Sequence, residues 1–169
     1  DKQHMKSRNT TSSARALIRY HKTNTHKRRM KKITMSDVKI NHLAIVVENI
    51  EESLGFWRDA LGLPMGEIKE VAQEEVKIAF LDAGEAHVEL VQPISDTSGI
   101  AKYLAKKGAG MHHVCFEVAD IEATMQAMSA KGVHLINETP RERDGRRYAF
   151  IHPKSTGGVL VELYETLPE

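Results

Sequence analysis

The strongest constraint on the fold is a repeat inside the chain, in which one pattern of residues occurs twice, 71 positions apart. A β-branched run begins at His42 and a similar run begins at His113, and each continues into a segment with helical periodicity. The same offset relates Trp57 to Met128 in those two segments. Repetition of one supersecondary unit predicts two modules that stack against each other.

Each module is predicted to follow the order β-α-β-β-β. In the first module we expect a strand at 39–47, a helix at about 51–61, and strands at 75–81 and 87–92, and the remaining strand is not assigned to residues. In the second we expect a strand at 113–118, a helix between the N-cap Asp120 and Gly132, and strands at 133–136, 147–151 and 159–164.

These elements predict the α+β class, with both modules contributing to one curved mixed sheet. A single domain is expected over residues 35–169, with modules at about 39–93 and 111–165 and a connecting helix at about 97–107. No apolar run approaches the roughly 20 residues that a membrane helix needs, so no membrane partner is expected. Cys115 is the sequence's one cysteine, which excludes an internal disulfide and suits a reducing compartment such as the cytoplasm.

The N-terminal segment differs from the rest of the chain in charge. Residues 1–34 hold eleven of the 24 Lys and Arg residues and one of the 23 acidic residues, so residues 35–169 have a net charge of −9. We expect a flexible extension without a role in the chemistry, because Met35-Ser36-Asp37 resembles a natural start. The Arg-rich, acid-poor composition also fits a transit peptide, which would place the protein in the mitochondrial matrix. A nucleic-acid partner is not expected, because Tyr20 is the segment's one aromatic residue.

Four residues at matching positions of the two modules are candidate metal ligands. His42 and His113 open the first strands, and Glu89 and Glu162 lie 73 positions apart in the last strands. A carboxylate on a half-buried strand is costly unless something neutralises it. If the first and last strands of each module are neighbours, all four side chains share one concave face. Two imidazoles and two carboxylates suit an octahedral divalent ion with two open positions.

Other interpretations of these residues are weighed against that site. Each of the four, taken alone, would more often be a structural or solvent-facing strand residue, and the match between modules is what favours ligation. The lack of sulfur in the set argues against a structural zinc site. His112 is expected on the opposite sheet face from His113, because side chains alternate along a strand. Cys115 is expected to be a packed thiol and Trp57 a core residue.

The ligand positions and the doubled module plan resemble the vicinal oxygen chelate superfamily. Within it, the stretches Glu89–Pro93, Gly110–Val114 and His152–Leu163 are similar to methylmalonyl-CoA epimerases, and the resemblance covers residues 39–165. It implies a homodimeric isomerase that acts on a CoA thioester and uses one divalent ion: cobalt, zinc, nickel or manganese. The ligands it implies are His42, Glu89, His113 and Glu162.

Two departures from the epimerase pattern keep alternatives open. Some epimerases carry glutamine at the position of Glu89, whereas glyoxalase I enzymes carry glutamate, so glyoxalase I is the first alternative. A non-catalytic ligand-binding member of the superfamily is the second. Some epimerases also use a glutamate base on the middle strand of the first module, where this chain has Lys77, and Glu75 is a weak substitute.

The implied reaction removes a weakly acidic proton from the carbon between a thioester and a carboxylate, and returns a proton to the other face. The enolate formed needs stabilisation by the metal. We expect Glu162 and Glu89, one from each module, to be the catalytic acid and base. The CoA phosphates need cations, and we expect Lys154 and Arg147 to bind them, the latter as part of a basic loop with Arg141, Arg143 and Arg146.

Overall fold

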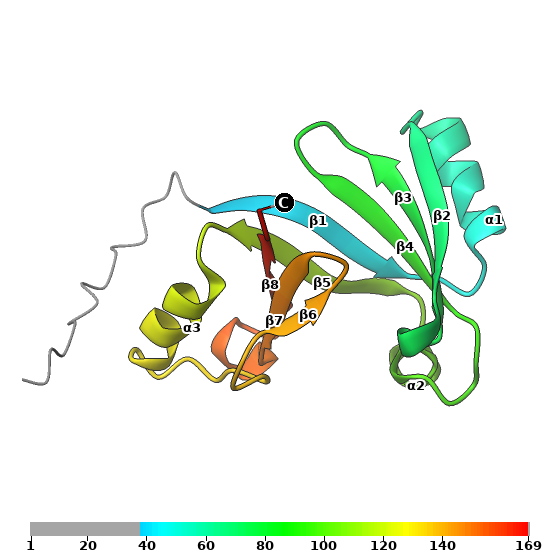
Figure 1. Cartoon of the computed structure of the whole chain (residues 1–169). Helices are drawn as coiled ribbons and strands as arrows, with labels where there is room; N and C mark the ends of the chain where they lie inside the picture. The colour runs from blue at the N-terminus through cyan, green and yellow to red at the C-terminus, as the bar shows by residue number, and fades with distance from the viewer. Residues whose placement is uncertain (1–37, 169) are drawn as a thin grey trace, which may run out of the picture.

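A computed structural model describes residues 38–168 (Figure 1). The basic extension predicted at 1–34 lies outside the described residues. The eight strands are β1 (Val38–Val46), β2 (Met65–Val71), β3 (Val76–Asp82), β4 (His87–Pro93), β5 (Gly110–Val118), β6 (Arg141–Arg143), β7 (Arg146–Ile151) and β8 (Leu160–Thr166). The helical segments are α1 (Ile50–Leu54), η2 (Gly55–Ala60), η3 (Ala72–Glu74), α2 (Gly99–Lys107), α3 (Ile121–Ser129) and η4 (Pro153–Ser155).

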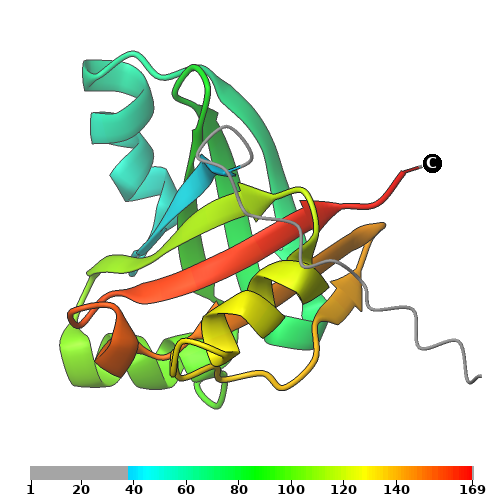
Figure 2. The same cartoon turned by 90° about the vertical axis from the view of Figure 1, so that its left-hand side faces the viewer.

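All eight strands form one mixed sheet, in the order β2-β3-β4-β1-β5-β8-β7-β6. The first and last strands of each module are parallel neighbours, β1 beside β4 and β5 beside β8. The two modules meet through the antiparallel pair of β1 and β5. Figure 2 shows the strands of the second module crossing those of the first, so the sheet curls around a concave face. The predicted α+β class and curved mixed sheet are therefore confirmed.

The helices of the two modules cover the face of the sheet that lies opposite the concave one. Ile50 and Leu54 of α1 are fully buried against Leu81 and Leu90 in the first core. In the second core, α3 packs on β7 and β8 in the same way, through Ile121, Met125, Ile151 and Leu163. Trp57 packs against the first core, as predicted. The side chains of β3 and β4 alternate between this core and the concave face.

Both helices begin at a side-chain cap. The side chain of Asp120, the predicted N-cap, accepts a hydrogen bond from the backbone N–H of Ala123, and Asn49 caps α1 in the same manner. The helix expected at 51–61 begins at Ile50 and widens into the π-helical segment η2. There the backbone N–H of Leu61 donates to the carbonyl of Phe56 at 2.8 Å. Among the described residues, no helix is long and apolar enough to cross a membrane.

Two strands differ from the sequence prediction. The strand expected at 133–136 is wrong, because Leu135 makes only an isolated bridge to Ile151. The second module instead uses β6, whose three charged residues have no apolar alternation that could reveal a strand. Similarly, the sequence does not reveal β2, because most of its side chains are exposed and show no apolar alternation. Both are edge strands, so neither needs the buried face that the hydrophobic pattern detects.

Candidate metal centre and active site

The register of the sheet brings the four predicted ligands onto one face. Glu89 pairs with Ala44, two residues beyond His42, and Glu162 pairs with Cys115, two residues beyond His113. Residues two apart on a strand share a face, so each carboxylate lies on the same side as the histidine of its own module. Across the module boundary, His42 pairs with Cys115 and His113 pairs with Ala44. The two halves of the site are therefore related by a pseudo-two-fold axis between β1 and β5.

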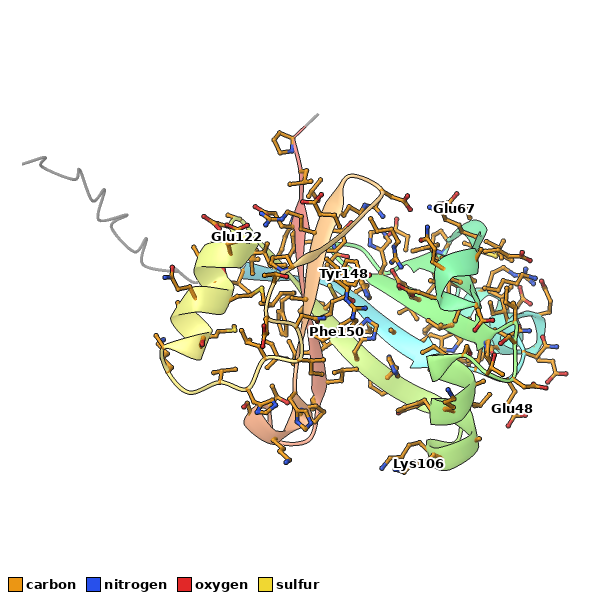
Figure 3. All side chains as sticks on the ribbon, turned by 60° about the horizontal axis from the view of Figure 1, so that its bottom comes forward. Glu48, Glu67, Lys106, Glu122, Tyr148 and Phe150 are labelled. Carbon is orange, nitrogen blue, oxygen red and sulfur yellow. The ribbon has the colours of Figure 1, made fainter. Side chains whose placement is uncertain are left out.

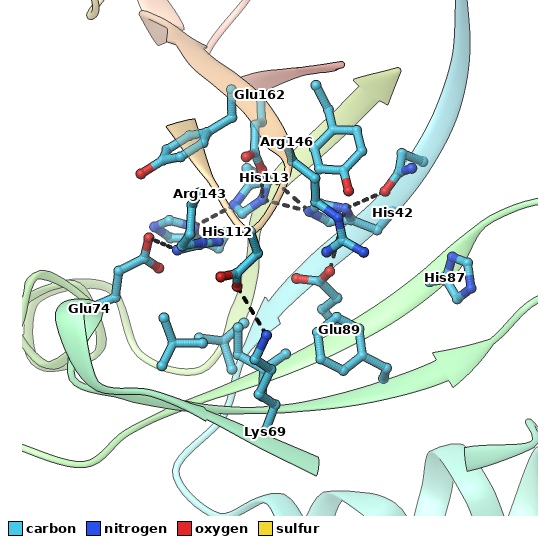
Figure 4. Close-up of a pocket in the computed structure, with 18 of the residues that line it drawn as sticks. His42, Lys69, Glu74, His87, Glu89, His112, His113, Arg143, Arg146 and Glu162 are labelled. Atoms are coloured by element: carbon cyan, nitrogen blue, oxygen red, sulfur yellow. Dashed lines mark hydrogen bonds and ion pairs between the residues drawn. The ribbon is translucent and has the colours of Figure 1, made fainter. Parts of the chain in front are cut away.

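The four side chains converge at short distances (Figure 4). Nε2 of His113 lies 2.8 Å from Oε2 of Glu162, and Nε2 of His42 lies 3.4 Å from the same oxygen. The two histidine Nε2 atoms lie 3.1 Å apart. Oε1 of Glu89 lies 3.5 Å from Nδ1 of His42. His42, His113 and Glu162 are all buried, so this polar cluster is shielded from bulk water.

The surroundings of Glu162 and Glu89 shift the pKa values of their carboxyl groups in opposite directions. Burial alone would raise the pKa of Glu162, but hydrogen bonds from His113 and His42 outweigh it and lower the pKa to about 2. Burial raises the pKa of Glu89 above its usual value, and the imidazole of His42 offsets only part of that effect. Burial works to lower the pKa of His42, but its hydrogen bond to Glu162 and the charge of Glu89 raise it. Glu89 is therefore the more basic carboxylate.

The donor set fits a divalent cation. Two imidazole Nε2 atoms that face each other at 3.1 Å need a proton or a cation between them, because two lone pairs repel. Two carboxylates, one of them ionised down to a pH of about 2, bring the negative charge that would neutralise such a cation. Metal sites built from nitrogen and oxygen donors bind borderline or hard divalent ions.

Cys115 lies closer to this cluster than its interpretation as a packed thiol implied. Donor atoms of Cys115, His42 and Glu162 all lie within 4.8 Å of one another. The thiol is completely buried, and burial together with the nearby charge of Glu162 raises its pKa far above the usual value. Without a cation it is therefore a neutral thiol packed against the ligand cluster.

The predicted orientation of His112 is wrong. His112 lines the same cavity as His113, and its Nδ1 lies 2.8 Å from Nδ1 of His113. Simple alternation fails here because Ile45 pairs with Met111 while Ala44 pairs with His113, which leaves His112 as the extra residue of a β-bulge. Burial and the neighbouring His113 lower the pKa of His112 to about 4, so its ring is neutral at physiological pH.

A cavity of about 630 Å³ opens between the two modules above the cluster, a volume typical of a small-molecule site. Phe80 of β3 contributes one aromatic wall. Tyr148 and Phe150 of β7, in the second module, contribute another (Figure 3). Three cationic side chains, Lys69, Arg143 and Arg146, also line it. Lys69 and Arg143 reach across the module boundary to carboxylates at the mouth, the former to Asp144 at 3.1 Å and the latter to Glu74.

Arg146 differs from the other two cations of the cavity. It forms none of the ion pairs found among residues 38–168, and its guanidinium lies over the ring of Tyr164, 5.7 Å from the ring centroid. Figure 4 shows its side chain directed into the space between the modules, near the four ligands. The charge of Arg146 acts to lower the pKa of His42, but the stronger effects of Glu162 and Glu89 raise it. It is a cation available to an anionic ligand.

The structure does not bring the two predicted phosphate-binding residues to the cavity. Arg147 follows Arg146 on β7 and points the other way, where its guanidinium contacts Glu122 and lies 3.4 Å from Glu165. Lys154 is exposed on η4, and its backbone N–H donates to Nδ1 of His152 at 3.1 Å. Alternation from Ile151 back along β7 could have separated Arg146 from Arg147, but the sequence does not show which face is concave.

The middle strand of the first module presents apolar residues to the cavity. Ile78 and Phe80 of β3 line it, whereas Lys77, between Val76 and Ile78, does not. Glu75 precedes the strand in a left-handed conformation with φ of 53° and does not line the cavity either. The position considered for a further glutamate base therefore has no acidic side chain facing the site.

Paired modules, a curled sheet and a buried cluster of two histidines and two glutamates define a protein built to hold a cation and a small ligand on a concave face. Residues 41–150 match the family model described as the Glyoxalase/Bleomycin resistance protein/Dioxygenase superfamily. The chain belongs to this superfamily, which is the vicinal oxygen chelate superfamily that the sequence resembles.

Several relatives within the superfamily are named as epimerases. The chain is 37% identical over 127 residues to the mitochondrial methylmalonyl-CoA epimerase of Mus musculus, an alignment covering 74% of this chain and 71% of that one. It is similar to the crystal structure of methylmalonyl-CoA epimerase from Mycobacterium tuberculosis, with a TM-score of 0.72 and 31% identity, covering 82% of this chain and 95% of that chain. A methylmalonyl-CoA epimerase solved in complex with methylmalonyl-CoA and NH4+ matches with a TM-score of 0.69 and 30% identity, covering 77% and 95%. The predicted resemblance to this group of isomerases is confirmed.

Proposed function

We propose that this protein is a divalent-metal-dependent epimerase that interconverts the (R) and (S) forms of methylmalonyl-CoA. The observation that supports it most is the pair of carboxylates, one from each module, on opposite sides of the pseudo-two-fold axis and on one cavity face. Inversion of a carbon centre requires a proton acceptor on one side and a proton donor on the other. A doubled module supplies both from equivalent positions.

The chain's own groups account for proton transfer. Glu89 is the better acceptor, because burial raises the pKa of its carboxyl toward that of a useful general base. Glu162 is held ionised by His113 and His42, so it keeps the two imidazoles in place and accepts the proton from the second face, while Glu89 in its protonated form donates to the first face. In the reverse direction Glu89 is the acceptor, and the proton left on Glu162 is returned. The sequence predicts both glutamates as acid and base, and the opposite pKa shifts support Glu89 as the stronger base. When bound, a divalent ion supplies a Lewis acid that stabilises negative charge on the substrate oxygens.

The cavity suits a substrate with a free carboxylate next to an apolar group. Arg146 offers a guanidinium that no carboxylate of the described chain engages in an ion pair, and guanidinium binds carboxylate through two parallel hydrogen bonds. Ile78, Phe80 and Phe150 form the apolar walls that a methyl group and a thioester chain would contact. The longer CoA portion would leave through the cavity mouth, where Lys69 and Arg143 lie. Lys154, exposed on η4, stays a prediction for the phosphate end.

Glyoxalase I remains the second candidate, because its ligand set is the same. The two activities differ in substrate: one enzyme needs an acyl-CoA carboxylate and the other a glutathione hemithioacetal. The names of the relatives support the epimerase. One experiment separates them: the cobalt-reconstituted protein is assayed in deuterated water for α-proton exchange of methylmalonyl-CoA and, in parallel, for isomerisation of the glutathione adduct of methylglyoxal. Exchange without isomerisation is expected, and the reverse result would eliminate the epimerase proposal.

A further inference from the structure

The pairing of β1 with β5 contains two bulges, and they occupy equivalent positions of the two modules. Ile40 pairs with Phe116 and His42 with Cys115, so Asn41 is an extra residue on β1. His112 is the corresponding extra residue on β5. Asn41 and His112 are 71 positions apart, the offset of the internal repeat, and each directly precedes a candidate metal ligand. A β-bulge re-aims a side chain that would otherwise face the other side of the sheet.

Each bulge residue contacts Nδ1 of the histidine that follows it, the ring nitrogen that does not face the histidine of the other module. Nδ1 of His42 also lies 3.5 Å from Oε1 of Glu89. Oδ1 of Asn41 lies 2.9 Å from Nδ1 of His42, and Nδ1 of His112 lies 2.8 Å from Nδ1 of His113. On the far side of each ring, the two Nε2 atoms face each other at 3.1 Å. Both imidazoles are therefore contacted at Nδ1 by a residue at the same position of the repeat.

The direction of the hydrogen bond in the first module follows from its neighbours. Nδ2 of Asn41 donates to Oε2 of Glu117 at 3.2 Å, and a carboxylate can only accept, so the amide nitrogen must face Glu117. The amide oxygen then faces His42, whose Nδ1 must carry the proton. Without a cation, Nε2 donates to Glu162. Once a cation takes the place of that Nε2 proton, the proton on Nδ1 leaves the ring neutral with its lone pair on Nε2, which points at the cluster.

The second module reaches the same result with a different residue. One nitrogen of the His112–His113 pair must donate and the other accept. When a cation replaces the proton that Nε2 of His113 donates to Glu162, the remaining proton of the neutral ring is on Nδ1. His112 is then the acceptor. The ring of Tyr103 on α2 packs edge-on against it, with centroids 4.7 Å apart, and the Tyr103 hydroxyl donates to the backbone carbonyl of Met111 at 2.8 Å. These contacts fix the ring of His112 as Glu117 fixes Asn41.

We propose that Asn41 and His112 are paired positioning residues, presented by equivalent β-bulges, that hold His42 and His113 with Nε2 directed at a divalent cation. This inference rests on the metal site of the proposed function, but not on the reaction. Outer hydrogen bonds of this kind fix the tautomer and orientation of a ligating imidazole, and their loss typically weakens metal binding by about 10- to 100-fold. The inward aim of these two side chains is a property of the bulges.

The test compares metal affinity in substitutions that keep or remove the acceptor. His112→Phe keeps an aromatic ring and removes the acceptor, and His112→Asn introduces the residue that the first module uses. Titration of the purified proteins with Co²⁺, followed by its absorption spectrum, should show affinity reduced by about 10- to 100-fold in His112→Phe. The affinity of His112→Asn should return to within about threefold of the original, a recovery that a purely space-filling role for His112 would not produce. Asn41→Leu should resemble His112→Phe.

A matched control comes from His87 on β4, which lines the cavity and has no hydrogen bond to the four ligands among the described contacts. His87→Phe should leave the Co²⁺ affinity unchanged. Unchanged affinity in His112→Phe, or an equal loss in His87→Phe, would overturn the proposal.

A second measurement uses the unaltered protein and so does not depend on the folding of a variant. Long-range ¹H–¹⁵N spectra of the Zn²⁺ complex should show the ring proton of both ligating histidines on Nδ1. A proton on Nε2 of either histidine would also overturn the proposed positioning role. If the unaltered protein binds Co²⁺ with these tautomers but exchanges no α-proton of methylmalonyl-CoA, the epimerase proposal fails and the positioning role stands.

Discussion

The Nε2 atoms of His42 and His113 lie 3.1 Å apart, although the two residues open the first strands of different modules. The antiparallel pairing of β1 and β5 brings them together, and Glu162 approaches both rings. Such an arrangement is stable without a metal only if a proton lies among these groups. A proton and a cation therefore compete for this site, and its metal affinity should depend on pH.

The first prediction concerns that pH dependence. Burial would lower the pKa of His42, but a hydrogen bond to Glu162 and the charge of Glu89 raise it, so in the metal-free protein His42 keeps its proton to a higher pH than an exposed imidazole does. A cation must displace this proton, so affinity should increase as pH rises through the pKa of His42 and then level off. Glu162, with a pKa of about 2, is ionised throughout and does not compete.

Calorimetry of Zn²⁺ binding in two buffers of different ionisation enthalpy measures the protons released. We expect about one proton per metal while His42 is protonated, and fewer as the pH rises through its raised pKa. A release that does not change with pH would contradict a proton held on His42.

The second prediction separates the roles of the two glutamates. Glu162→Gln removes the carboxylate that contacts both imidazoles, so metal affinity should fall together with α-proton exchange. Glu89→Gln should keep most of the metal affinity, since glutamine can still offer an oxygen. It should nevertheless lower exchange in deuterated water by about 10²- to 10⁴-fold, the usual contribution of a general base.

Glu165→Gln is the control for both variants. Glu165 lies on the same strand as Glu162, but it contacts Arg147 and does not line the cavity. It should retain both metal affinity and exchange. Full exchange activity in Glu89→Gln would remove that residue as the base.

The third prediction distinguishes two adjacent arginines. Arg146 lines the cavity and Arg147 points away from it, so only the former should bind the substrate carboxylate. Arg146→Gln should raise KM for methylmalonyl-CoA by about 10- to 100-fold, the effect of one lost charge-assisted hydrogen-bonded pair. Inhibition by propionyl-CoA, which lacks the carboxylate, should not change.

Arg147→Gln provides the comparison in this experiment. It should leave KM unchanged and reduce the melting temperature slightly, because Arg147 joins Glu122 of α3 to Glu165 of β8. If the two variants have the same effect on KM, the assignment of the carboxylate to Arg146 is wrong.

The fourth prediction concerns Cys115. Burial raises the pKa of its thiol and the side chain is inaccessible, so a disulfide reagent should react with it only after unfolding. Cys115→Ala should lower the free energy of unfolding by about 1 kcal/mol through lost packing and leave Co²⁺ affinity intact. A loss of affinity, or a sulfur-to-cobalt charge-transfer band in the unaltered protein, would show that the thiol is a ligand.

Much of the fold and of the ligand set could be predicted because the information is periodic and occurs twice. The 71-residue offset paired His42 with His113, and a lone carboxylate in each apolar last strand, 73 positions apart, selected Glu89 and Glu162. A charged residue in an apolar run is costly to bury, so it is visible in the residues themselves. The edge strand β6 could not be predicted, because its three charged residues show no hydrophobic pattern.

Tertiary structure alone decided how the site is completed. A bulge turned His112 toward the ligands that strict alternation would have put behind it, and the curl of the sheet decided that Arg146 faces the cavity while Arg147 does not. The same packing made Glu89 more basic than Glu162, although the two hold equivalent positions. The sequence by itself determined which residue types the two modules repeat. Register, bulges and burial depend on contacts between distant segments, and only the folded sheet decides these.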